Sequence, residues 1–533
     1  MPPPKHQRAR KPKSKNGCVT CKMRHVRCDE EKPECKKCTE SGRKCDGYKT
    51  ASQTELRNEI TQGLPQHPWR LSPDHRLVLL PGSREERQYV LLFNGQATRA
   101  LSGFFPSNYW SQYIPQLSHH CPTIRHAVAA VGAVYERQIN GLLLPATETD
   151  PGAAEHFELQ QYNKAIQGFV EQLASPEKPG ISMILTTCLL FICVEVLRTN
   201  NGRALNHVQG GLQILARHLQ DGKPIVKNDS DRELVHLFYR LNLQGSFFGR
   251  GLLQLDLPIE KSTSMGVANK LVFDHISQAR ECLTSLANRA FSFIRKVSYP
   301  PLTPSEVKDQ HRQLDQHQTG QLQLDQPRLV LEFCLWETAF ESMKTRSAKR
   351  VGISDPRAPL ALQIEYHTMS IWLKCCLSRG QLFYDRFFPE FESIVSAAEK
   401  IIDLGTGPDV TDFPSQFSLD AEVIPALYWT ASHCRDSRIR RRAIEATRNY
   451  PTREGMWHKR RYVEAATKIM EFEEAHCSFL PVEERIPEEC YRIHDALMFS
   501  EEAFYTNPCP VMFLWKPHGL DADFEKYWDE VQW

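Results

Sequence analysis

Six cysteines lie within 28 residues near the start of this 533-residue chain. Their spacing is C-x2-C-x6-C-x6-C-x2-C-x6-C, one half-motif written twice, and they are Cys18, Cys21, Cys28, Cys35, Cys38 and Cys45. A disulfide framework needs an oxidising compartment, and the N-terminal residues lack the apolar stretch of an export signal. We therefore expect a reduced, intracellular chain in which paired C-x2-C motifs bind metal.

The number of thiolates indicates which metal arrangement they form. Zinc favours thiolate sulfur and four ligands in a tetrahedron. Two Zn²⁺ ions need eight ligand positions, and six thiolates fill them when two sulfurs bridge both metals. Cys18 and Cys35 each lead one half-motif, so they are the expected bridging pair. No position is left for water, and we expect two structural zinc ions per chain.

Charge is distributed unevenly along the chain. Residues 1–50 carry 15 Lys and Arg against 6 Asp and Glu, whereas the rest carries 51 against 58. A basic segment joined to a mildly acidic body is typical of a polyanion binder. The cationic side chains within the cysteine cluster are candidates for DNA contact, and they are Lys22, Arg24, His25, Arg27, Lys36 and Lys37. Zinc ligands at both ends of the 21–28 segment would hold its side chains rigidly.

The stretch from Gly17 to Tyr48 resembles the fungal zinc binuclear cluster (Zn2Cys6) transcription factor family. It shares the six cysteines, the basic run, Asp29 after the third cysteine and Pro33 before the fourth. The resemblance implies two short helices around two zinc ions, with the first helix presented to a CGG triplet in the DNA major groove. Arg24 and His25 align with the base-reading positions of the family. Lys22 and Arg27, on the flanks, are better placed to contact phosphates.

This resemblance implies a nuclear, sequence-specific DNA-binding regulator of transcription by RNA polymerase II. Its expected partners are double-stranded DNA and the transcription machinery or co-regulators, and family analogy adds control of a metabolic or secondary-metabolite gene cluster. The alternative is a repressor or protein-contact cofactor without its own sequence readout. A basic run before the cluster is expected to direct nuclear import or to grip phosphates, through Arg8, Arg10, Lys11, Lys13 and Lys15.

Beyond the cluster, we expect a large all-α regulatory domain. The expected organisation is a basic arm at 1–16, the cluster at 17–48, a proline-containing linker at 49–87 and the body at 88–533. Apolar stripes at helical spacing follow Pro122 and precede Gly405. The uncharged stretch Ile181–Val194 is too short to span a membrane and predicts a buried helix. Segments such as His207–Leu215 are similar to the helical regulatory domain of filamentous-fungal members.

The oligomeric state stays open at this level. Leu56, Ile60 and Leu64 fall on one helical face but cover barely two turns, which is too little for a stable coiled coil. One triplet contact is also too small a site for selective binding. Either the body forms a homodimer, or the protein binds as a monomer with help from its arm.

Two further segments carry specific expectations. The glutamine-rich stretch 302–327 has few apolar anchors and is expected to be a loop. The C-terminal Leu520–Trp533 interleaves acids with aromatics. It suits an acidic activation segment, or a terminal helix that packs Phe524, Tyr527, Trp528 and Val531 on the body.

An enzymatic body is not expected. The sequence holds no G-x-S-x-G, Walker A, G-x-G-x-x-G or H-E-x-x-H motif. His119-His120 and Cys375-Cys376 are adjacent pairs, and neighbouring residues on a helix point in different directions. The cysteines outside the cluster lie in apolar segments and behave as small hydrophobes.

Overall fold

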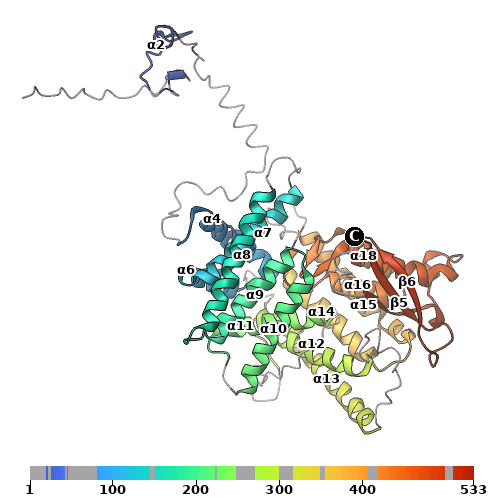
Figure 1. Cartoon of the computed structure of the whole chain (residues 1–533). Helices are drawn as coiled ribbons and strands as arrows, with labels where there is room; N and C mark the ends of the chain where they lie inside the picture. Colours follow the sequence, from blue (N-terminus) through green and yellow to red (C-terminus); the bar gives the residue numbers. More distant parts are fainter. Residues whose placement is uncertain are drawn as a thin grey trace, which may run out of the picture. The chain divides into compact units, whose positions relative to one another are not determined.

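The computed structural model describes residues 18, 20–21, 24, 26–42, 45, 81–143, 151–222, 225–247, 271–298, 316–347, 355–405, 417–498 and 508–532. The chain divides into two compact units, residues 1–79 and residues 80–533 (Figure 1). The first unit contains the cysteine cluster and the short helix α2 (Lys36–Thr39). The predicted import residues and Leu56, Ile60 and Leu64 lie outside the described residues.

Helices make up most of the second unit. Its first part contains α4 (Arg84–Leu92), η2 (Phe93–Ala97), α5 (Thr98–Ser102), η3 (Tyr109–Tyr113), α6 (Ile114–His120), α7 (Pro122–Leu143), α8 (Pro151–Ala174), α9 (Ile181–Leu197), α10 (Asn201–Gln220) and α11 (Asp229–Phe247). Its second part contains α12 (Ile276–Ser298), α13 (Gln316–Ser347), α14 (Arg357–Cys375), η5 (Gln381–Phe387), α15 (Phe388–Gly405), α16 (Ile424–His433), α17 (Ser437–Asn449) and α18 (Lys459–Glu474). The short helical turns η6 (Ala475–Cys477), η7 (Val482–Glu484) and η8 (Glu489–Tyr491) follow.

Local sequence explains where several helices begin. Ser83 and Glu86 form a reciprocal capping box at the start of α4. The Asp436 carboxylate accepts hydrogen bonds from the first backbone N–H groups of α17. α7 begins at Pro122, whose missing N–H costs nothing in a first turn. Capping residues and a first-turn proline are local features, so the helix starts that they mark can be predicted from sequence.

α9 is the central helix of the first part. It is buried continuously from Leu185 to Leu197 and packs against α7 and α10. The predicted buried helix at Ile181–Val194 is therefore confirmed, and three further residues belong to it. In the described part of the chain, no helix combines the length and the apolar character that a membrane crossing requires.

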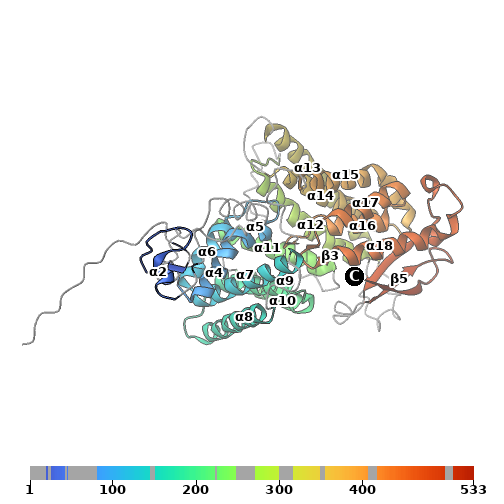
Figure 2. The ribbon, with the colours of Figure 1, turned by 90° about the horizontal axis from the view of Figure 1, so that it is seen from above.

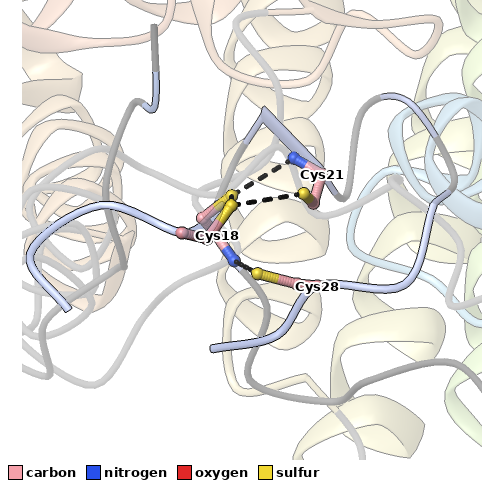
Figure 3. A group of neighbouring side chains, drawn as sticks. Cys18, Cys21 and Cys28 are labelled. Atoms are coloured by element: carbon pink, nitrogen blue, oxygen red, sulfur yellow. Dashed lines mark hydrogen bonds between the residues drawn. The ribbon is translucent and has the colours of Figure 1, made fainter. Parts of the chain in front are cut away.

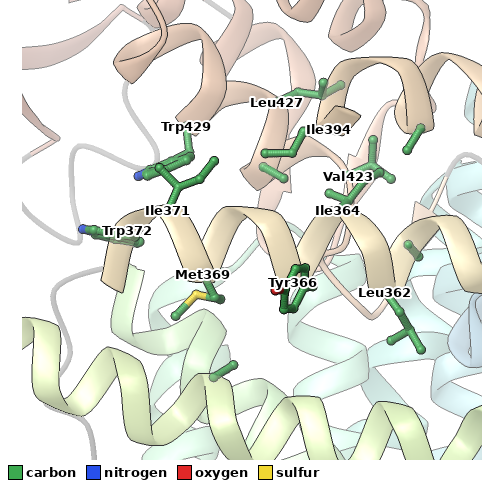
Figure 4. Close-up of a cluster of buried hydrophobic side chains, with 14 of the residues drawn as sticks. Leu362, Ile364, Tyr366, Met369, Ile371, Trp372, Ile394, Val423, Leu427 and Trp429 are labelled. Carbon is green, nitrogen blue, oxygen red and sulfur yellow. The ribbon is translucent and has the colours of Figure 1, made fainter. Parts of the chain in front are cut away.

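α14 lies at the centre of the second part. It packs against α12 and α13 on one side and against α15 and α16 on the other (Figures 2 and 4). Ile371 extends from α14 toward Trp429, whereas Leu362 and Met369 extend from the opposite side of the helix into the same apolar core. The apolar stripe that precedes Gly405 faces this core from α15.

The body is largely helical, as predicted, and it also contains two small sheets. The two-residue strands β1 (Phe417–Ser418), β2 (Arg453–Glu454) and β3 (Trp457–His458) form one small sheet, parallel between β1 and β2 and antiparallel between β2 and β3. β4 (Ile493–Met498), β5 (Cys509–Trp515) and β6 (Glu525–Val531) form an antiparallel sheet in that order. This second sheet packs on α18 through Ile469, Val511 and Phe513.

The predicted C-terminal helix is wrong, because Glu525–Val531 is strand β6. Its side chains alternate between two faces, so Tyr527 and Trp528 point in opposite directions. The glutamine-rich stretch is also corrected: it is helical from Gln316 onward, and residues 302–315 lie outside the described residues. Glutamine is a good helix former, so a glutamine-rich composition does not exclude a helix.

Candidate metal centre and nucleic-acid interface

The six cluster cysteines come together and are buried. Their sulfurs form two groups in which all atoms lie within 4.8 Å, one of Cys18, Cys21, Cys28 and Cys35, the other of Cys18, Cys35, Cys38 and Cys45. Cys18 and Cys35 belong to both groups, and their Sγ atoms are 3.5 Å apart. This is the arrangement that two metal ions with two shared ligands require.

The sulfur separations fit zinc. A zinc–sulfur bond of about 2.3 Å in a tetrahedron places neighbouring sulfurs about 3.8 Å apart. The Cys18–Cys38 separation is 3.8 Å and the Cys21–Cys35 separation is 3.6 Å. Burial raises the pKa of the Cys18 thiol to about 12 and raises that of Cys35 as well. Zinc, when bound, supplies the positive charge that lets such thiols ionise.

Backbone N–H groups point at the same sulfurs. Cys21 N donates to Cys18 Sγ at 3.3 Å, and Cys18 N donates to Cys28 Sγ at 3.4 Å (Figure 3). The second half repeats the latter contact, with Cys35 N donating to Cys45 Sγ at 3.5 Å. Both contacts span ten residues, so the sequence repeat is also a repeat of structure. These donors would stabilise thiolate charge.

Asp29 joins the two halves of the cluster. Its Oδ2 accepts a hydrogen bond from Lys36 N at 2.8 Å, and its Oδ1 accepts one from Lys37 N at 3.4 Å. These are the first N–H groups of α2, which have no partner within the helix. The carboxylate that follows the third cysteine therefore holds the helix that carries Cys38.

The structure describes four of the six predicted DNA-contact residues. Arg27 is exposed, and Arg24 is half-buried with Nη1 donating to Ser41 Oγ at 3.0 Å. Lys36 forms an ion pair with Glu31 at 2.6 Å, and Lys37 lies 4.0 Å from Glu40. Lys22 and His25 lie outside the described residues.

The acidic neighbours change which of these basic side chains we expect to contribute most to DNA binding. Lys36 and Lys37 already share their charge with glutamates, whereas Arg27 has no ion pair among the described residues. Val26, which the sequence pattern did not single out, is 41% exposed beside Arg27. An exposed apolar side chain at a basic surface can contact a thymine methyl group. Spacing alone could not have found it, because exposure depends on how the cluster folds.

Comparison with known families agrees with this geometry. Residues 16–55 match the fungal Zn(2)-Cys(6) binuclear cluster domain, and residues 91–299 match the fungal specific transcription factor domain. The chain therefore contains both domains that characterise the fungal Zn(2)-Cys(6) transcription regulators, and the relatives it matches are regulators of this kind. The family binds zinc through its six cysteines and binds DNA, and its members regulate transcription rather than catalyse reactions.

Several curated relatives share parts of this regulator. The aspercryptin biosynthesis cluster-specific transcription regulator of Emericella nidulans is 24% identical, over 87% of this chain and 88% of its own length. A transcription regulator of Purpureocillium lilacinum is 27% identical over 37% of this chain and 48% of its own. Sterol uptake control protein 2 of Saccharomyces cerevisiae is 61% identical over 33 residues, which are 6% of this chain and 4% of its own. No solved structure shows a significant match.

Proposed function

We propose that this regulator binds two zinc ions per chain and reads a CGG-type triplet in the major groove. The observation that carries the proposal is the pair of four-sulfur groups that share Cys18 and Cys35. Each group supplies one tetrahedron of thiolates, and the shared sulfurs bring the ligand total to eight. The metal role is structural, because the thiolates fill every coordination position.

In this proposal the 21–28 segment carries the base readout. Arg24 and His25 contact guanine, where arginine can donate two hydrogen bonds to O6 and N7. Lys22, Arg27, Lys36 and Lys37 contact phosphates and add affinity without sequence information. Arg24 is positioned by Ser41, which lies beyond the helix that carries Cys38. The second half of the cluster would thus orient the reading side chain of the first.

We further propose that the protein acts in the nucleus on genes transcribed by RNA polymerase II. The basic run from Arg8 to Lys15 would serve as the import signal, followed by the cluster at 17–48 and a linker. The predicted linker end at residue 87 is too late, because α4 of the body already begins at Arg84. A biosynthetic gene cluster is the proposed target. Support comes from the Emericella nidulans relative, a regulator specific to the aspercryptin biosynthesis cluster, whose sequence aligns along most of both chains.

Selection from a randomised DNA duplex library tests the DNA readout. The full-length protein with zinc should enrich CGG-containing sites, and a zinc chelator should abolish the enrichment. Arg24→Ala should relax the preference within the triplet, since a bidentate contact discriminates by about 1–3 kcal/mol. Arg27→Ala is the matched control, and it should weaken binding to all sequences while reducing the salt slope by about 0.9.

Two results would contradict the proposal. Enrichment that persists after zinc removal would exclude a zinc-organised reading surface. Zinc retention without enrichment of any sequence would instead favour the protein-contact role. The two results separate loss of metal from loss of DNA readout.

A further inference from the structure

The outer edges of the C-terminal sheet, on β4 and β6, differ in how their backbone groups are hydrogen-bonded. On β4, Ile493 N donates to Glu473 Oε1 at 2.7 Å, and Ile493 O accepts from Arg435 Nη2 at 2.9 Å. Buried side chains therefore satisfy the start of that edge. On β6, no strand of the described chain pairs with the edge that faces away from β5. An edge of this kind can accept another strand.

The pairing with β5 determines which backbone groups of β6 point outward. Glu530 lies opposite Pro510, which has no N–H to donate. The backbone groups of Glu530 are therefore directed to the outer edge, where its N–H donates to the Asp529 side chain at 2.7 Å. Because these directions alternate along an antiparallel strand, Trp528 and Lys526 also present their backbone groups outward.

The side chains of the same three residues share one face of the sheet. The Tyr527 ring lies against Phe472 of α18, tilted by 32° with ring centroids 5.4 Å apart, and Asp529 forms an ion pair with Lys468 of α18 at 2.9 Å. Alternation then places Lys526, Trp528 and Glu530 on the opposite face. Trp528 is 56% exposed. A large aromatic side chain thus lies exposed at the middle of an open strand edge.

We propose that β6 pairs in antiparallel fashion with β6 of a second copy of this chain, about a two-fold axis at Trp528. In this register Lys526 of each copy lies opposite Glu530 of the other, so two ion pairs flank the paired tryptophans. Centring the axis on Tyr527 would oppose Glu525 and Asp529. Centring it on Asp529 would oppose that carboxylate to itself. Charge therefore selects Trp528 as the centre.

The contact is small, and its size predicts its strength. Seven-residue strands joined at one edge bury less than the roughly 1,200 Å² typical of stable interfaces. We expect a reversible dimer at high protein concentration. On DNA with two triplets, binding of both zinc clusters would raise the effective concentration of the two bodies; this last step rests on the proposed function.

Sedimentation velocity of the full-length protein without DNA tests the pairing through charge reversal. Wild type should dimerise with rising concentration. Lys526→Glu and Glu530→Lys should each shift the protein to monomer, because each places like charges opposite one another twice. Mixing the two variants should restore a heterodimer, and the double variant should restore the homodimer. Lys400→Glu, an exposed reversal on α15, should leave dimerisation unchanged.

Thermal unfolding of each variant shows that loss of the dimer is not loss of the fold. A wild type that is monomeric at every concentration overturns the proposal, as does a dimer that neither reversal weakens. Failure of the mixed variants to associate would overturn the register. DNA selection is a separate readout: variants that cannot pair should still bind single CGG sites if the proposed function holds.

Discussion

At the residue scale, Asp29 shows how one carboxylate can organise a metal cluster without binding metal. Its two oxygens accept from the N–H groups of Lys36 and Lys37, at the start of the helix that carries Cys38. Those N–H groups have no other partner along the helix. The residue thus positions a zinc ligand of the other half-motif.

Removing this carboxylate should loosen the second half of the cluster. We expect Asp29→Ala to release zinc several-fold faster to a competing chelator, because α2 loses its first hydrogen-bond acceptor. Asp29→Asn keeps one acceptor oxygen and should behave in between. A colorimetric zinc indicator follows the release. Identical release rates for all three proteins would contradict a positioning role.

A second residue, Glu365, lies in a cluster of acidic and basic side chains between α11, α12 and α14. Asp420 there accepts hydrogen bonds from Arg240 at 2.8 Å and Arg280 at 2.6 Å. Glu365 accepts no hydrogen bond from the described residues, and burial raises its pKa to about 7 despite the two arginines. Its ionised form is therefore disfavoured in the folded protein.

The raised pKa predicts how stability depends on pH. The unfolded value is about 4.3, so the contribution of Glu365 to stability falls as pH rises from about 4.3 to about 7 and stays low above that. Glu365→Gln should raise the thermal midpoint at about pH 8, with a smaller gain at about pH 5.5. Glu471→Gln, an exposed control on α18, should change neither. An equal gain at both pH values would contradict the assignment.

At the element scale, the packing of α10 on α11 depends on Gly211. The sequence alone does not show that this glycine, and not the adjacent Gly210, lies at the contact between the helices. A methyl group at Gly211 would collide with the Phe238 ring, whereas one at Gly210 has no atom within 4 Å. Both glycines lie inside α10. Gly211 permits the close approach of α10 and α11, whereas Gly210 only weakens α10.

These two glycines offer a matched pair of substitutions. Gly211→Ala should lower the free energy of unfolding by about 1–3 kcal/mol, because the buried ring must move. Gly210→Ala should raise it by about 0.5–1 kcal/mol through better helix propensity. Chemical denaturation of the two variants measures both. Equal effects on stability would show that the helix approach is not tight at Gly211.

At the scale of the whole molecule, the two units are stabilised by different physics. The cluster is too short to bury a sufficient apolar core, so its fold depends on metal ligation. The body has an extensive apolar core around α14 together with buried ion pairs, such as Glu473 between Arg435 and Arg440. Neither kind of stabilisation substitutes for the other.

Zinc removal should therefore affect the two units unequally. A chelator should abolish DNA binding measured by fluorescence anisotropy. The helical circular dichroism of the body and its thermal midpoint should change little, since the body uses none of the cluster ligands. Restored zinc should restore DNA binding. Loss of body helicity together with zinc would contradict this division.

The metal centre was predictable from sequence because its chemistry is local and countable. Six thiolates within 28 residues allow few arrangements, and the half-motif repeat singled out the two sulfurs that the structure places in both groups. The helical body and the buried stretch Ile181–Val194 were predictable for a similar reason, since apolar content and periodicity report burial directly.

Other features required the tertiary structure. The segment Glu525–Val531 carries too few residues for periodicity to separate strand from helix, and pairing with the apolar strand β5 decided the outcome. The ion pairs of Lys36 and Lys37, the exposure of Val26 and the collision at Gly211 likewise depend on which neighbours approach. The sequence by itself determined the ligand set, while only the folded chain decided which cations remain available and which strand edge stays open.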